Sequence, residues 1–176
     1  MVEGLNVVLI GYRGTGKTFV GRALAKKLGW KFRDSDDEVV KRAGRTIPEI
    51  FRRSGEPEFR RMEKEAIFLL SSLDNHVIAT GGGAVMDEEN ASNLKANGFV
   101  VLLDASPEKI FKRIGKDKNR PSLTKKEGIE EVKHLLEVRK PFYEKAADAR
   151  VSSESTSVEE NVEEIVRLLK KRGILD

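Results

Sequence analysis

Residues 6–10 read Asn-Val-Val-Leu-Ile, and residues 11–18 continue as Gly-Tyr-Arg-Gly-Thr-Gly-Lys-Thr. The first run is short and apolar and ends at a glycine, which is typical of a buried parallel strand. The second run fits the pattern G-x-x-x-x-G-K-[ST] of a phosphate-binding loop. A helical pattern follows over 17–28, with Val20, Leu24 and Leu28 on one face. The strand, the loop and the helix therefore stand in the order that such a loop requires.

The residue types of this loop predict how it would hold a nucleotide. Its glycines allow backbone N–H groups to turn inward around phosphate oxygens, and the helix N-terminus adds a partial positive charge. We expect Gly14, Thr15 and Gly16 to contact ATP in this way. Lys17 would reach the β- and γ-phosphates, and the Thr18 hydroxyl would bind Mg²⁺.

Strand and helix patterns alternate along the rest of the chain, which indicates an α/β fold with a parallel sheet and right-handed crossovers. We expect further strands at 31–34, 76–80, 99–103 and 149–151. The expected helices cover 35–44 (capped by Ser35 or Asp36), 46–55, 57–72, 87–97, 107–115, 129–143 and 157–169. The polar stretch 116–126, which contains Pro121, is the best candidate for a mobile loop.

Composition narrows the class of protein. The 176 residues suit one domain, and the apolar and charged fractions, 39% and 35%, are those of an ordinary folded chain. Cysteine is absent, which excludes disulfides, cysteine nucleophiles and cysteine-bound metals. No secretory signal or apolar run of membrane-spanning length is visible, so we expect a cytoplasmic protein. The net charge of +4 is too small and too interleaved to indicate nucleic acid.

A loop of this kind needs a carboxylate near the magnesium ion, and the sequence offers two alternatives. Asp104 ends the apolar run 100–103, in the position of a Walker B acid, although it also precedes a helix entry and could instead accept backbone N–H bonds there. Asp34 and Asp36 follow the expected strand at 31–34. Both alternatives lie at the carboxyl edge of the expected sheet, where ligands bind, so position alone does not decide between them. We favour Asp34 and Asp36, because one carboxylate could hold the metal's water shell while the other accepts a hydrogen bond from a substrate hydroxyl.

Six motifs, taken together and in this order, resemble the shikimate kinase family over about residues 5–152. They are Gly11 to Thr18, Asp34-Ser35-Asp36, Gly55-Glu56-Pro57-Glu58-Phe59-Arg60-Arg61, Thr80-Gly81-Gly82-Gly83, Arg120-Pro121 and Arg139-Lys140-Pro141-Phe142-Tyr143. The first motif is shared by many families, whereas the combination is far more specific. The resemblance implies a three-layer α/β/α fold with a central five-stranded parallel sheet. It further implies a single domain, with a small substrate-binding lobe at about 35–62 and a lid at about 115–127.

The resemblance also implies roles for individual residues of the acceptor site. Arg60 and Arg139 match the residues that bind the shikimate carboxylate, which suits the planar guanidinium fork. Asp36 matches the residue that hydrogen-bonds the hydroxyl being phosphorylated and could act as a base. The backbone of Gly82 and Gly83 would face the substrate. Phe51 and Phe59 match apolar walls of the pocket, where ordinary core packing is the alternative.

For the nucleotide side, the resemblance places Asp34 near Mg²⁺, Arg113 over the adenine and Arg120 in a lid that closes on ATP. Two features depart from the family pattern. Ser122 stands where the family often has leucine, and the stretch 153–157 near the expected adenine site has neither a basic residue nor proline.

The function implied is transfer of the γ-phosphoryl group of ATP to the 3-hydroxyl of shikimate, on the route to chorismate and the aromatic amino acids. Lys17, Asp36 and Arg120 would be catalytic, ATP the co-substrate and Mg²⁺ the cofactor. The resemblance implies a monomer whose partners are these small molecules, with no nucleic acid or membrane. The alternatives are another small-molecule kinase of the same fold, for gluconate or a nucleoside monophosphate, and a non-enzymatic nucleotide-dependent module.

Overall fold

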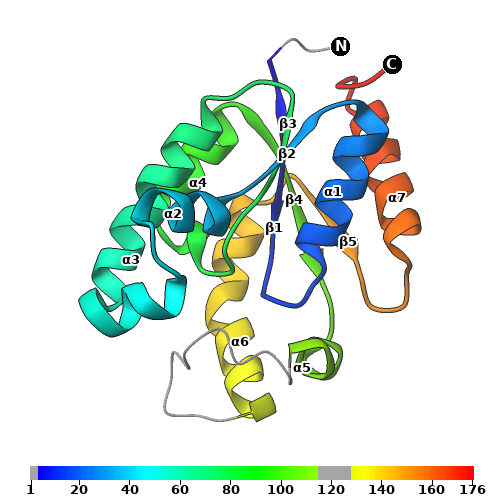
Figure 1. Ribbon diagram of the computed structural model, residues 1–176. Helices are drawn as coiled ribbons and strands as arrows, with labels where there is room; N and C mark the ends of the chain where they lie inside the picture. The colour runs from blue at the N-terminus through cyan, green and yellow to red at the C-terminus, as the bar shows by residue number, and fades with distance from the viewer. Residues whose placement is uncertain (1–3, 115–127) are drawn as a thin grey trace.

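The computed structural model describes residues 4–114 and 128–176, which form a parallel sheet with helices on both faces (Figure 1). The strands are β1 (Asn6–Ile10), β2 (Lys31–Asp34), β3 (His76–Ala79), β4 (Gly98–Asp104) and β5 (Ala149–Ser152). The helices are α1 (Lys17–Leu28), α2 (Ser35–Ala43), α3 (Ile47–Ser71), η1 (Ala84–Met86), α4 (Glu88–Ala96), α5 (Pro107–Ile114), α6 (Gly128–Ala146) and α7 (Val158–Lys171).

The sheet order is β2-β3-β1-β4-β5, and every pairing is parallel. The first strand of the chain therefore lies at the centre, flanked by β3 and β4. Leu9 is in register with Ala79, and the next residue, Thr80, donates its backbone N–H to the Leu9 carbonyl at 3.1 Å. The phosphate loop after β1 and the glycine loop after β3 thus leave the sheet side by side, at the edge where ligands of such sheets bind.

Alternate residues of β1 serve two separate apolar cores. Val7 and Leu9 pack with α1 and α7 on one face of the sheet, and Val8 and Ile10 pack with α3, α4 and α6 on the other (Figure 1). All five residues of the strand are buried. This is why β1 has no polar alternation: a central parallel strand is covered on both sides.

Helix α3 is two helical segments that join at a kink. Gly55 has φ 78° and ψ 175°, a conformation outside the helical region that L side chains rarely adopt. Thr46 and Glu49 form a capping box at the start of the first segment. The kink brings Phe51 and Phe59, which lie on opposite sides of it, to 5.0 Å between ring centroids.

The predicted α/β fold with five parallel strands is confirmed, and the helix break at Gly55 was correctly expected. The expected cap of α2 is wrong. Asp34, and not Ser35 or Asp36, is the N-cap, because β2 runs into the helix with no intervening residue and the Asp34 side chain accepts from the Asp36 N–H. Helix α6 is longer than predicted, since it continues through Pro141 to Ala146, and the single turn η1 was not predicted.

Among the described residues, the helices are all too short or too polar to cross a membrane.

The two-core arrangement predicts that the α7 face is a major source of stability. Ile165 is fully buried in the core formed with α1, so Ile165→Ala should lower the free energy of unfolding by about 2–5 kcal/mol through lost burial and a cavity. Phe68→Ala is the control, because Phe68 is 61% exposed and its loss should change the free energy by less than about 1 kcal/mol. Urea unfolding measures both, and equal losses would contradict this assignment of the core.

Candidate active site

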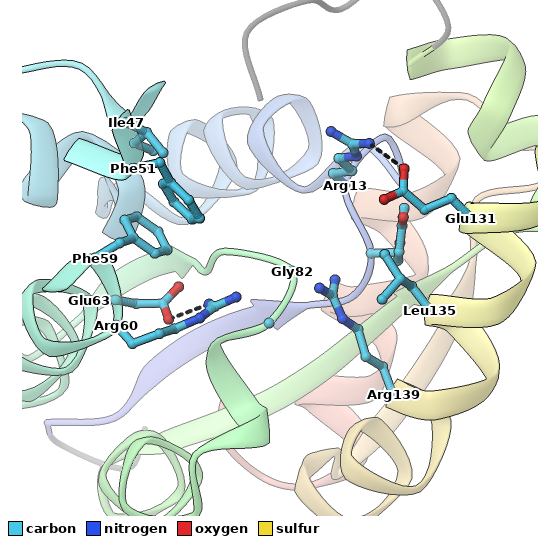
Figure 2. Close-up of a pocket in the computed structure, with 12 residues that line it drawn as sticks. Arg13, Ile47, Phe51, Phe59, Arg60, Glu63, Gly82, Glu131, Leu135 and Arg139 are labelled. Carbon is cyan, nitrogen blue, oxygen red and sulfur yellow. Dashed lines mark hydrogen bonds and ion pairs between the residues drawn. The ribbon is translucent and has the colours of Figure 1, made fainter. Parts of the chain in front are cut away.

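Two adjoining hollows open at the carboxyl edge of the sheet. The phosphate cleft is lined by the loop 13–18 and by Phe19, Val20, Asp34, Asp36, Thr80, Gly81, Gly82, Arg113, Ile114, Ser153, Thr156, Val158 and Asn161. The inner pocket, shown in Figure 2, is lined by Tyr12, Arg13, Ile47, Phe51, Phe59, Arg60, Glu63, Gly82, Gly83, Glu131, Leu135 and Arg139. Arg13 and Gly82 belong to both linings, so these two residues mark the junction of the hollows.

The phosphate loop is shaped by close backbone approach. A Cβ on Gly11 would lie 2.2 Å from the Leu103 carbonyl oxygen, so only glycine fits where the loop leaves β1. Lys17 is buried and its Nζ donates to the carbonyls of Gly11 and Tyr12 at 2.7 and 2.8 Å. The lysine is therefore already folded over the loop, where an incoming phosphate would compete for its N–H donors.

The carboxylate beside this loop is Asp34. Its Oδ1 accepts from the backbone N–H of Asp36 at 2.9 Å, and the Thr18 hydroxyl donates to its Oδ2 at 3.4 Å. Burial, together with the nearby Asp37, raises the pKa of Asp34, and Lys17 opposes that rise. A half-buried carboxylate next to a hydroxyl is the kind of oxygen pair that magnesium accepts while it keeps several waters. These two residues therefore fit a magnesium ion.

The rival acid lies elsewhere. Asp104 is paired with Arg150, and it lines a separate hollow between β4 and α6. It is absent from the lining of the phosphate cleft, which leaves Asp34 and Asp36 as the carboxylates that the described residues contribute there. Asp36 lies beside the glycine loop, and its Oδ1 would be 3.0 Å from a Cβ at Gly81.

Two arginines from different helices face each other across the inner pocket (Figure 2). Arg60, on α3, is held by Glu63 at 2.8 Å and by Glu56 at 3.1 Å. Glu63 is 1% exposed, and burial raises its pKa against the lowering effect of Arg60. Arg60 therefore has a fixed position but keeps part of its guanidinium toward the pocket.

Arg139, on α6, is the second arginine, and it is 5% exposed. Its guanidinium carbon stands 5.3 Å from the centroid of the Tyr12 ring. Its buried Nε has no hydrogen-bond partner in the described parts of the chain. Because an unsatisfied buried cationic donor is costly, this group points to an anionic ligand that completes it.

The glycine loop between β3 and η1 passes through the narrowest part of the site. A Cβ at Gly82 would be 3.1 Å from Arg139 Nη1 and 3.3 Å from the Arg13 backbone nitrogen. At Gly83 it would be 2.9 Å from Arg60 Nη2. Side chains here would press against the ends of the two arginines, so the glycines leave room for both guanidinia at the pocket.

Tyr143 fixes this loop from behind. Its buried hydroxyl donates to the Gly82 carbonyl at 2.5 Å, and burial raises its pKa to about 12, so it stays protonated as a donor at neutral pH. The opposite wall of the pocket is apolar, with the Phe51 and Phe59 rings inclined at 38°. The pocket thus combines two guanidinium groups with an aromatic wall.

At another part of the phosphate cleft, Arg113 is bound to the protein itself. Its guanidinium donates to the carbonyls of Gly14 and Ser153 at 3.1 and 2.8 Å. The stretch 153–157, whose role was open from the sequence, contributes Ser153 and Thr156 to the same lining.

The structure brings the sequence-predicted residues of the described chain into these two hollows, whereas Arg120 lies outside the described residues. Sequence reasoning assigned no role to six further residues that line the inner pocket, namely Tyr12, Arg13, Ile47, Glu63, Glu131 and Leu135. Glu63 had a signal, because it lies one helical turn after Arg60. Glu131 had none, since nothing local marks which residue of α6 approaches the phosphate loop.

Comparison with known proteins gives one consistent family. The sequence model described as shikimate kinase matches residues 13–170. A shikimate kinase of Caldanaerobacter subterraneus subsp. tengcongensis is 44% identical over 96% of this chain and 98% of its own length. One of Hahella chejuensis is 46% identical over 94% of this chain and 86% of its own.

Solved structures agree. Shikimate kinase from Acinetobacter baumannii, in complex with shikimate, matches with a TM-score of 0.91 and 37% identity, covering 96% of this chain and 94% of that one. The Bacillus subtilis YorR protein matches with a TM-score of 0.66 at 18% identity, over 97% of this chain and 99% of its own, which is a likeness of fold alone.

The Tyr143 contact generates a prediction about the glycine loop. Tyr143→Phe keeps the ring but leaves the buried Gly82 carbonyl without this donor, so it should lower the free energy of unfolding by about 1–3 kcal/mol. Urea unfolding followed by tryptophan or circular dichroism signals would measure the change. A variant as stable as the parent chain would show that the hydrogen bond does not fix the loop.

Proposed function

The chain belongs to the shikimate kinase family, and from that membership we propose which of its residues perform the reaction. The enzyme transfers the γ-phosphoryl group of ATP to the 3-hydroxyl of shikimate. The comparisons give no support to the alternative acceptors gluconate and nucleoside monophosphates. The observation that carries the assignment of roles is the pair of guanidinia, Arg60 and Arg139, facing one small pocket beside the phosphate loop.

Shikimate is a small ring with one carboxylate and three hydroxyls. We assign its carboxylate to Arg60 and Arg139, because the buried Arg139 Nε needs an acceptor and the guanidinium fork matches a carboxylate. The ring then lies against Phe51 and Phe59, and the backbone of Gly82 and Gly83 passes beside it. Segment 35–62, which supplies Arg60 and both phenylalanines, would be the substrate-binding lobe.

We infer that the hydroxyl end of the ring lies toward the phosphate cleft, because the reacting hydroxyl has to reach the γ-phosphate bound there. Asp36 lines that cleft beside Gly81, so we assign it to the reacting hydroxyl, whose oxygen it orients and whose proton it accepts. The γ-phosphorus–oxygen bond to ADP breaks as the bond to the 3-oxygen forms. Little covalent work falls to the protein, because phosphoryl transfer depends on positioning and charge neutralisation.

On the nucleotide side, the loop N–H groups of Gly14, Thr15 and Gly16 would bind phosphate oxygens. Lys17 would exchange its carbonyl partners for the β- and γ-phosphates. Thr18 and Asp34 would hold Mg²⁺, which neutralises phosphate charge when bound.

The remaining assignments rest on the family. Arg113 would cover the adenine after release from Gly14 and Ser153. Arg120 in the segment 115–127, expected as a lid, stays a prediction, as do a monomeric state and a cytoplasmic location.

The acceptor assignment has a direct test. ADP release with Mg-ATP should be fast with shikimate and at background with gluconate, AMP, CMP or no acceptor. Turnover with another acceptor would overturn the assignment of the inner pocket, and release without any acceptor would indicate a nucleotide hydrolase.

The role of Asp36 has a matched control next to it. Asp36→Asn should keep ATP binding but lower kcat by about 10²–10⁴-fold, because the orienting carboxylate is lost. Asp37 is exposed and lines neither hollow, so Asp37→Asn should keep kcat within about twofold. Steady-state kinetics and nucleotide titration measure both variants, and near-parental turnover of Asp36→Asn would remove its assigned role.

A further inference from the structure

Arg13 is a third guanidinium at the inner pocket that the assigned roles leave unused. It occupies the third position of the phosphate loop, and it lines the inner pocket and the phosphate cleft alike. Its side chain is 26% exposed, so it is accessible to a ligand. Figure 2 shows it at the rim of the pocket, on a different side from Arg60 and Arg139.

Its acidic partner is Glu131 on α6, whose side chain is 9% exposed. The distance from Arg13 Nη2 to the Glu131 carboxylate is 3.9 Å, longer than the 2.8 Å between Arg60 and Glu63. The pair is therefore close enough for charge attraction but too long for a hydrogen bond. A guanidinium has five N–H donors, so a contact through Nη2 leaves others for a second anion.

The location of Arg13 suits contact with the phosphate during and after its transfer. The phosphoryl group starts on the phosphate loop and ends on a substrate in the inner pocket, so it crosses the junction that Arg13 and Gly82 form. Shikimate has no charge at its 3-hydroxyl, whereas the product has a phosphate of charge about −1.5 to −2 there. A cation at the junction therefore meets an anion during and after transfer, but not when shikimate binds.

We propose that Arg13, held near Glu131, binds the transferred phosphate at the junction of the two hollows and so discriminates the phosphorylated product from shikimate. This inference rests on the proposed function. In the transfer, the γ-phosphorus–oxygen bond to ADP breaks, the bond to the 3-oxygen forms, and the hydroxyl proton goes to Asp36. Arg13 takes no proton and forms no covalent bond. It supplies a positive charge that stabilises the transferred phosphate and that does not contribute to the binding of shikimate.

The test compares two ligands on the full chain. Titration calorimetry with 3-phosphoshikimate and with shikimate, both without nucleotide, should show that Arg13→Met weakens the product about tenfold, the loss expected for one charge-assisted hydrogen bond. The dissociation constant of shikimate should stay within about twofold. In steady-state assays kcat should fall while KM for shikimate is unchanged, since the contact is made only after transfer begins.

Three variants separate this role from a structural one. Arg13→Lys should recover part of the product affinity, because it keeps the charge. Glu131→Gln removes the competing carboxylate, so product affinity should stay or rise. Arg53→Met changes an exposed arginine of α3 outside both hollows and should alter neither ligand.

The outcomes are distinct. Equal weakening of both ligands by Arg13→Met, or an unchanged product affinity, would overturn the proposal. The proposal would also be overturned if Glu131→Gln lowered the affinity for the product as much as Arg13→Met does. The ion pair would then have a structural role, holding the phosphate loop against α6. If Arg13→Met does not fold, Arg13→Lys and Glu131→Gln still decide by the direction of their effects. The parental chain tests the proposed function separately, since failure to bind or phosphorylate shikimate would refute that function whatever the variants do.

Discussion

The close approach of two backbone segments is the constraint on which the site depends. The glycine loop after β3 runs beside the phosphate loop, with the Gly82 Cβ position 3.3 Å from the Arg13 nitrogen and 3.1 Å from the Arg139 guanidinium. Parallel pairing of β1 with β3 enforces this approach, because it starts both loops at the same level of the sheet. The distance between the phosphate loop and the glycine loop is thereby set by strand register, and not by flexible side chains.

Charge compensation then lets several arginines share a small volume. Arg60 has buried Glu63 as its partner, and Arg13 has Glu131, whereas the Arg139 Nε has no partner in the described chain. Mutual repulsion of uncompensated guanidinia would destabilise the empty pocket. The two glutamates offset that repulsion, and the unsatisfied Arg139 Nε remains as a donor for the anion that we propose binds here.

The sheet and the phosphate loop could be predicted because their signals are local: apolar runs of strand length, and glycines at fixed spacing before Lys17. Arg60 and Arg139, to which we assign the acceptor carboxylate, were predicted from the motifs that carry the family resemblance. Pairings between distant segments could not be predicted. Arg13 and Glu131 are far apart in the chain, and only the packing of α6 beside the phosphate loop places them together. The cap of α2 was misassigned for a related reason, since the sequence does not reveal that Asp34 ends the strand and begins the helix at once.

The kink at Gly55 has an evolutionary consequence. In an unbroken helix, residues 51 and 59 would lie about 12 Å apart along the axis, too far for their rings to pack against each other. The kink at Gly55 brings the ring centroids of Phe51 and Phe59 to 5.0 Å and so creates the aromatic wall. Purifying selection for acceptor recognition should therefore fall on Gly55, a residue that lines neither hollow. A method that infers ligand-contacting residues from sequence conservation alone would therefore wrongly identify Gly55 as a residue that contacts the ligand.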